Sequence, residues 1–280
     1  MRPMPPSASA PSSVIRSRDG TPIAVFGSGD GPPLVLVHGA AADHTTFRVL
    51  GPLLVPMFTT HAIDRRGRGA SGDTAPYAIE REFEDVAAVA AAVAREAGGP
   101  VDVFGHSYGG RCALGAALLS PDIRRVISYE GAPTPPGERY GDEALADELQ
   151  ELADAGRNEA LLERFLTEVV GMTAPELEHY RADPVWPLRV AAAPTIAREL
   201  AVEAGDAAGL DRLGQVRQPV LQILGGDSKR EFGAATAALD DRLTDGTIVV
   251  IPGAKHAAHH THPVAVVEAL TAFLAEPRHP

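Results

Sequence analysis

The chain has 280 residues, 45% of them hydrophobic, which is enough to bury one large core. Its 25 basic and 37 acidic side chains give a formal net charge of −12, which argues against a polyanionic partner such as nucleic acid. The single cysteine, Cys112, excludes an internal disulfide, and no apolar run approaches the roughly 18 residues of a membrane span.

The first half of the chain alternates between strand and helix patterns. Residues 1–13 are rich in proline, serine and alanine, which predicts a flexible tail. This tail has no apolar central stretch of the kind found in a signal peptide, so we expect a cytoplasmic protein. An opening hairpin is expected at residues 14–16 and 23–26. Strands are then expected at 34–37, 60–63, 101–104 and 125–130, with helices at 47–54 and 83–97.

One segment lies between the strand at 101–104 and a small-residue helix pattern at 112–118. It reads Gly105-His106-Ser107-Tyr108-Gly109-Gly110, which places a glycine-flanked serine on a tight strand-to-helix turn. A G-x-S-x-G turn of this kind holds the serine in a strained backbone conformation, and its glycines let strand and helix approach closely. The pattern therefore predicts a nucleophilic serine, Ser107, whose hydroxyl stands clear of the sheet at a helix N-terminus.

The alternation stops near residue 134 and resumes near residue 217. The stretch between is rich in alanine, leucine, glutamate and arginine, and its apolar positions predict about four helices inserted after the sixth strand. The chain then completes the sheet with strands at 220–224 and 248–251 and helices at 232–243 and 264–274. The expected fold class is α/β, a doubly wound, mostly parallel sheet with helices on both faces. Its core comprises 14–133 and 217–280, and residues 134–216 form a helical cap.

Four segments resemble the α/β-hydrolase superfamily, and in particular its serine esterase and lipase-like members with an inserted helical cap. They are LVLVHG at 34–39, DRRGRGAS at 64–71, the serine turn itself and GAKH at 253–256. In order and spacing they cover about residues 14 to 275. The resemblance implies the α/β-hydrolase fold and an enzyme with a serine nucleophile, a histidine and an acid, and it is more specific for the fold than for the substrate.

The resemblance places the base at His256, in the Gly-x-x-His loop after the last strand, where a neutral imidazole can accept the serine proton.

Two carboxylates are candidates for the acid that orients the imidazole of His256. We prefer Asp227, which follows the first strand after the cap, where most members carry the acid. Its spacing differs from the family pattern: Asp227 lies two residues after Gly225, whereas in many members the acid lies three residues after the strand-ending glycine. The alternative is Glu130, at the end of the sixth strand, a position that some members with a cap use. Either carboxylate would orient the imidazole and stabilise its charged form.

The oxyanion hole requires two backbone donors. The resemblance implies the N–H of Tyr108, directly after the nucleophile, and the N–H of Ala40, in the loop after the third strand. His38, in the same loop, is interpreted as a structural hydrogen-bonding residue.

Other polar clusters receive structural interpretations. The histidines at 256, 259, 260 and 262 do not predict a metal site, because metal ligands are usually held on rigid elements with supporting partners. Asp64 and the arginines after it match a structural turn of the family, and Cys112 is expected to pack as a small apolar residue.

Taken with the resemblance, these residues imply a hydrolase that cleaves a carboxylic ester, thioester or lactone through an acyl-enzyme on Ser107. We expect no cofactor, no nucleic-acid or membrane partner, and a small-molecule substrate with an apolar acyl or alcohol group. Two alternatives stay open: a non-hydrolytic use of the same residues as a lyase, perhydrolase or cyclase, and a sensor of a small ligand. An intact nucleophile, base and acid favours turnover over sensing.

Overall fold

The computed structural model describes residues 10–141, 143–203 and 205–276. These residues form one eight-stranded sheet in the order β1-β2-β4-β3-β5-β6-β7-β8. The β1–β2 and β2–β4 pairs are antiparallel and every other pair is parallel, which confirms the expected α/β fold class. The strands are β1 (Ser13–Arg16), β2 (Pro22–Ser28), β3 (Pro33–Val37), β4 (Thr59–Ile63), β5 (Val101–His106), β6 (Ile123–Tyr129), β7 (Val220–Gly225) and β8 (Gly246–Ile251).

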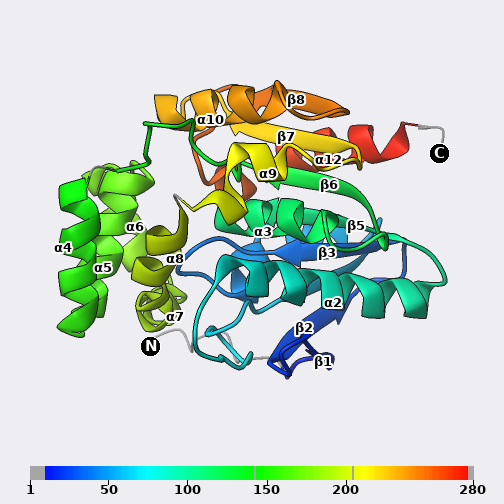
Figure 1. The fold of residues 1–280 in the computed structure, drawn as a ribbon, viewed down its shortest axis with the longest axis horizontal. Helices are drawn as coiled ribbons and strands as arrows, with labels where there is room; N and C mark the ends of the chain where they lie inside the picture. The colour runs from blue at the N-terminus through cyan, green and yellow to red at the C-terminus, as the bar shows by residue number, and fades with distance from the viewer. Residues whose placement is uncertain (1–9, 142, 204, 277–280) are drawn as a thin grey trace.

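Helices cover both faces of this sheet (Figure 1). One face packs against α2 (Ile79–Ala97), α3 (Tyr108–Ala117) and α10 (Arg230–Asp240). The other face packs against α1 (Gly51–Leu54) and α12 (Pro263–Ala275). Two short helices, η1 (His44–Arg48) and α11 (Ala258–Thr261), lie in loops. No helix of the described residues is long and apolar enough to cross a membrane.

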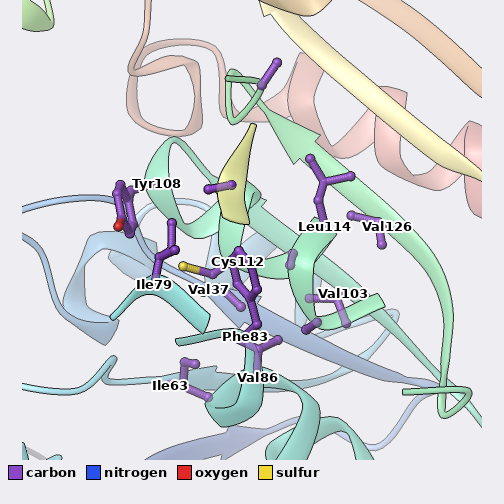
Figure 2. Packing of buried hydrophobic residues seen from close by; sticks show 14 of the residues in the cluster. Val37, Ile63, Ile79, Phe83, Val86, Val103, Tyr108, Cys112, Leu114 and Val126 are labelled. Atoms are coloured by element: carbon purple, nitrogen blue, oxygen red, sulfur yellow. The ribbon is translucent and has the colours of Figure 1, made fainter. Parts of the chain in front are cut away.

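Side-chain alternation along β3 shows why the sheet has a core on each face. Val35 and Val37 belong to the cluster under α2 and α3, whereas Leu34 and Leu36 belong to the cluster under α1 and α12. A period of two sends successive side chains to opposite faces, so a continuous apolar run suits a strand that is buried on both. Figure 2 shows the first cluster, where residues of α2 and α3 pack against residues of the sheet and Cys112 is buried among them.

The segment between β6 and β7 is helical. It contains α4 (Glu143–Asp154), α5 (Asn158–Arg164), the π-helical turn η2 (Phe165–Val169), α6 (Ala174–Arg181), α7 (Trp186–Ala192), α8 (Thr195–Glu203), the 3-10 turn η3 (Asp206–Ala208) and α9 (Leu210–Leu213). Figure 1 shows α4 to α8 gathered together at one end of the sheet, and we call these five helices with η2 the inserted helices. Helix α9 lies instead beside the core helices, where its Asp211 pairs with Arg242, directly after α10.

The turn between β5 and α3 leaves no space for extra atoms. A Cβ on Gly105 would lie 2.3 Å from the Gly109 carbonyl oxygen and 2.5 Å from Gly110 Cα. A Cβ on Gly109 would lie 2.3 Å from the Val37 carbonyl oxygen. These contacts are with backbone, which cannot rotate away, so the glycines are required for strand and helix to approach.

Gly105→Ala is therefore expected to lower the free energy of unfolding by about 3 kcal/mol, as overpacking against a rigid backbone does. Gly99→Ala is the matched control, because a Cβ there has nothing within 4 Å. Urea unfolding followed by circular dichroism measures both variants, and the control is expected to stay within about 0.5 kcal/mol of the parent. Equal stability of the two variants would contradict the close approach.

Candidate active site

Backbone strain is concentrated at the carboxyl ends of three neighbouring strands. The three non-glycine residues with positive φ in the described part of the chain are Ala41, Ser107 and Glu130, at 48°, 54° and 48°. They follow β3, β5 and β6, which are adjacent in the sheet. Such conformations are unfavourable for residues with a Cβ and persist only where the surroundings enforce them, typically at functional sites. The strained turn at Ser107 is the conformation that the G-x-S-x-G pattern predicts.

Ser107, Glu130 and His256 line one small cavity of about 40 Å³, which we call the serine cavity. His256 Nδ1 lies 2.5 Å from Glu130 Oε2, and both side chains are almost completely buried. Because a carboxylate only accepts, the ring nitrogen Nδ1 carries the proton and donates it. The other ring nitrogen, Nε2, is then the one with a free electron pair, as a general base requires.

Asp227, the carboxylate preferred from the sequence, is not the one that the fold brings to the histidine. It is exposed at the surface, and its backbone N–H donates to the Ala254 carbonyl oxygen at 2.8 Å. The alternative acid, Glu130, is in contact with His256, and its second oxygen accepts from Gly225 N–H at 2.8 Å and from Ser228 Oγ at 2.5 Å. The loop after β7 thus binds the carboxylate that the strand β6 supplies.

The His256 loop is held by side chains from three other elements. His106 Nε2 donates to the His256 carbonyl oxygen at 2.8 Å. The Tyr129 hydroxyl donates to the Lys255 carbonyl oxygen and accepts from Ala258 N–H at 2.9 Å. Phe232, on α10, stacks on the His256 ring with 4.4 Å between centroids. Local sequence patterns carry no signal for these contacts, because they join residues more than 20 positions apart.

The neighbouring histidines are neutral structural rings. Burial, followed by the charge of His256, lowers the pKa of His106 well below its usual value, and burial lowers that of His259 in the same way. Their rings lie 4.1 Å apart between centroids. Within residues 10–141, 143–203 and 205–276, no group of three or more histidine, cysteine or acidic side chains is placed to hold a metal ion.

The loop after β3 approaches the serine closely. A Cβ on Gly39 would lie 3.1 Å from Ser107 Cβ, and the two predicted oxyanion donors, Ala40 and Tyr108, both line the serine cavity. His38 is completely buried: its Nδ1 donates to Gly39 O at 2.8 Å, and its Nε2 accepts from the backbone N–H of Arg65 at 3.0 Å. Burial, then the positive charges of Arg65 and Arg68, lower the pKa of His38, so the ring is neutral.

The DRRGRGAS segment is a hydrogen-bonded turn from which three buried arginines reach inward. Asp64 accepts from the backbone N–H groups of His44 and Ala70, both at 2.8 Å. Further along, Arg65 binds Glu82 of α2 at 2.8 Å, and Arg68 binds the same carboxylate at 3.2 Å. Burial alone would raise the pKa of Glu82, but the two arginines outweigh it and hold the pKa at about 2.

The same two arginines also bind Glu199 of α8. A buried four-residue cluster therefore joins the core to the inserted helices: Arg65, Arg68, Glu82 and Glu199. It pairs two arginines with two glutamates, so each buried charge has an opposite charge in contact with it.

A much larger cleft of about 600 Å³ lies next to the serine cavity. The two spaces share Tyr140, Val169 and Leu200 as lining residues. Residues 133–141, with parts of α4 and of the η3–α9 region, form the rest of this outer cleft. These three shared residues form the partition between the cavity of the half-buried Ser107 and the outer cleft.

A family model described as the alpha/beta hydrolase family matches residues 34–269. The chain belongs to this family, and it is an esterase-like hydrolase, as the sequence resemblance implied. Among solved structures, an alpha/beta hydrolase from Sphaerobacter thermophilus DSM 20745 has a TM-score of 0.77 and 33% identity. The match covers 92% of this chain and 100% of that one.

Two curated relatives match most of the chain. The pimeloyl-[acyl-carrier protein] methyl ester esterase of Xanthomonas campestris pv. campestris is 32% identical, covering 88% of this chain and 96% of the relative. The 2-(acetamidomethylene)succinate hydrolase of Mesorhizobium japonicum is 28% identical, covering 88% of this chain and 89% of the relative. Both are named as hydrolytic enzymes.

The two candidate acids are separated by Glu130→Gln and Asp227→Asn. We expect Glu130→Gln to lower kcat by about 10⁴, the loss seen when a triad acid becomes an amide in a serine protease. A single amide oxygen cannot accept from His256 Nδ1–H and also from Gly225 N–H and Ser228 Oγ, so the imidazole loses its orientation and tautomer. Asp227→Asn is expected to change kcat less than twofold. Initial rates with p-nitrophenyl acetate measure both, and the reverse ranking would return the acid to Asp227.

Proposed function

We propose that this protein is a serine hydrolase that cleaves a carboxylic ester, thioester or lactone through an acyl-enzyme on Ser107. Glu130 is the triad acid, His256 the base, and Tyr108 and Ala40 supply the oxyanion donors. The observation that carries this proposal is the buried hydrogen bond between His256 Nδ1 and Glu130, beside a serine in a strained turn and in the same cavity.

In the first half of the reaction, Ser107 Oγ attacks the substrate carbonyl carbon while His256 Nε2 takes the hydroxyl proton. The carbonyl oxygen becomes an oxyanion, which the backbone N–H groups of Tyr108 and Ala40 stabilise. The bond to the leaving oxygen or sulfur then breaks, and that atom receives the proton from His256. In the second half, water attacks the acyl-enzyme in the same way and releases the acid and Ser107.

Glu130 contributes without changing its own protonation state. Its Oε2 fixes the ring tautomer of His256 and stabilises the positive imidazolium that forms during attack. Its Oε1 is held by Gly225 N–H and Ser228 Oγ, so the carboxylate enters the reaction already oriented. Such preorganisation avoids reorganising the groups at the moment of reaction.

The inserted helices act in this proposal as a cap over the serine, and they lie within the segment 134–216 that the sequence predicts as the cap. Apolar residues of these helices line the serine cavity, among them Phe165, Val169, Ile196 and Leu200. This lining supports a substrate with an apolar acyl or alcohol group. A cavity of about 40 Å³ accepts a group of only a few atoms, so a larger remainder of the substrate would lie in the outer cleft.

The cytoplasmic location stays an expectation from the sequence.

A fluorophosphonate probe is expected to label Ser107 and abolish turnover, because it reacts with an activated serine in place of the substrate. Intact-protein mass spectrometry should show one adduct, and Ser107→Ala should show none. The variant should retain only the residual catalysis that binding and the oxyanion donors supply. Full ester hydrolysis by Ser107→Ala would refute the acyl-enzyme.

Leu200→Ala removes apolar volume from the partition between the serine cavity and the outer cleft. We expect it to raise kcat/KM for p-nitrophenyl octanoate relative to acetate by about tenfold, the scale of a few methylenes in an apolar pocket. Leu188→Ala, on the partly exposed surface of α7, is the control and should leave the ratio unchanged. An unaltered ratio in Leu200→Ala would mean that the partition does not select chain length.

A further inference from the structure

Glu199 is a buried carboxylate at the active site to which the mechanism above gives no role. It lies on α8, its side chain is only 2% exposed, and it lines the serine cavity together with Ser107 and His256. A carboxylate is costly to bury, and a structural one is normally hydrogen-bonded at both oxygens.

The two oxygens of Glu199 have different surroundings. Oε1 accepts hydrogen bonds from Arg65 Nη2 and Arg68 Nη2 of the buried ion-pair cluster. Oε2 is buried and has no hydrogen-bond partner in the described part of the protein. Since Oε1 is occupied by the two arginines, Oε2 is the one oxygen of Glu199 with an unused acceptor position.

Glu82 shows what a purely structural member of this cluster looks like. Its Oε2 accepts from Arg65 Nε at 3.0 Å, and its Oε1 accepts from Arg65, Arg68 and the Tyr77 hydroxyl, the last at 3.1 Å. Glu82 does not line the serine cavity. Of the two carboxylates in the cluster, the one that lines the serine cavity is therefore the one with an unused acceptor.

The rest of the cavity wall contributed by the inserted helices cannot fill that role. Phe165, Val169, Val170, Ile196 and Leu200 are apolar, so Glu199 is the acceptor on that side of the bound substrate. An apolar group placed against Oε2 would leave a buried charge unpaired, whereas an O–H or N–H would pair with it. Discrimination by hydrogen bonding of this kind separates substrates more strongly than apolar shape does.

We propose that Glu199 Oε2 accepts a hydrogen bond from a donor group of the substrate, so that the enzyme selects acyl compounds carrying an O–H or N–H close to the scissile carbonyl. This inference rests on the proposed function, because it requires Ser107 to hold the carbonyl in the same cavity. It makes Glu199 a specificity-determining residue and defines the substrate class as hydroxyacyl or amidoacyl esters, thioesters or lactones.

The test uses two pairs of phenyl esters in which a hydroxyl is exchanged for a methyl group: 2-hydroxypropanoate with 2-methylpropanoate, and 3-hydroxypropanoate with butanoate. For the parent protein, kcat/KM of the hydroxyl compound is divided by kcat/KM of its methyl partner. This ratio is then divided by the ratio of the two rate constants for hydrolysis by hydroxide, which removes differences in intrinsic reactivity. We expect a preference for the hydroxyl compound of about ten- to a hundredfold in at least one pair.

Glu199→Gln is expected to abolish or reverse that preference. The two guanidinium groups require an acceptor, so the amide oxygen stays with Arg65 and Arg68 and the amide –NH₂ takes the place of Oε2. A donor then faces the substrate where an acceptor was. Glu82→Gln is the matched control, because it removes the same charge from the same cluster but has no face in the cavity. It should alter kcat/KM of both partners by the same factor and leave their ratio intact.

The outcomes separate this inference from the proposed function. If, in both pairs, the parent protein hydrolyses the hydroxyl and the methyl compound at rates that follow their reactivity with hydroxide, the inference is wrong, and no variant is needed to show it. An equal change of ratio in Glu199→Gln and Glu82→Gln would also overturn it, since the effect would then come from the cluster as a whole. If fluorophosphonate fails to label Ser107 and neither ester is cleaved, the proposed function falls and the inference falls with it.

Discussion

The close approach of β5 and α3 is the constraint on which the rest of the site depends. Gly105 and Gly109 leave backbone against backbone at the turn, and Ser107 between them is held at a positive φ that its own Cβ disfavours. Packing of helices against both faces of the sheet stabilises the fold and so holds Ser107 in this strained conformation. Glu130 and Ala41 are strained in the same way at the ends of the strands on either side, so three unfavourable conformations converge where the proposed chemistry takes place.

The buried cluster of Arg65, Arg68, Glu82 and Glu199 has a second, mechanical consequence. It fixes α8 to the turn after β4 and to α2 through charges that are withdrawn from water. Removing one partner from such a cluster typically costs about 3–5 kcal/mol, because it leaves an uncompensated charge. The position of α8 beside the serine cavity is therefore coupled to the core through this cluster.

Local patterns in the sequence were sufficient for the strands and for the serine turn, and insufficient for contacts between distant residues. The apolar run at 34–37 and the mostly apolar run at 101–104 predicted the central strands, because a strand that is buried on both faces is apolar along most of its length. The helix predicted at 83–97 begins earlier, at Ile79, since its first turn has few apolar positions to reveal it. Glu199 carried no signal at all: one glutamate in an amphipathic helix is ordinary, and its environment is created by arginines more than 130 positions away.

The choice between Asp227 and Glu130 shows why spacing could not decide the acid. Asp227 lies one residue too early in the loop after β7, and at that position its carboxylate is exposed while its backbone binds Ala254. The same loop nevertheless contributes to the site, because Gly225 and Ser228 hold the Glu130 oxygen that faces away from His256. A glutamate at the end of β6 is one methylene longer than an aspartate, and the positive φ at Glu130 turns the chain at the strand end. The Glu130 carboxylate therefore comes from the end of β6, and the donors that hold it come from Gly225 and Ser228 at the end of β7 and just after it. Asp227, in the loop after β7, takes no part in the contact with His256.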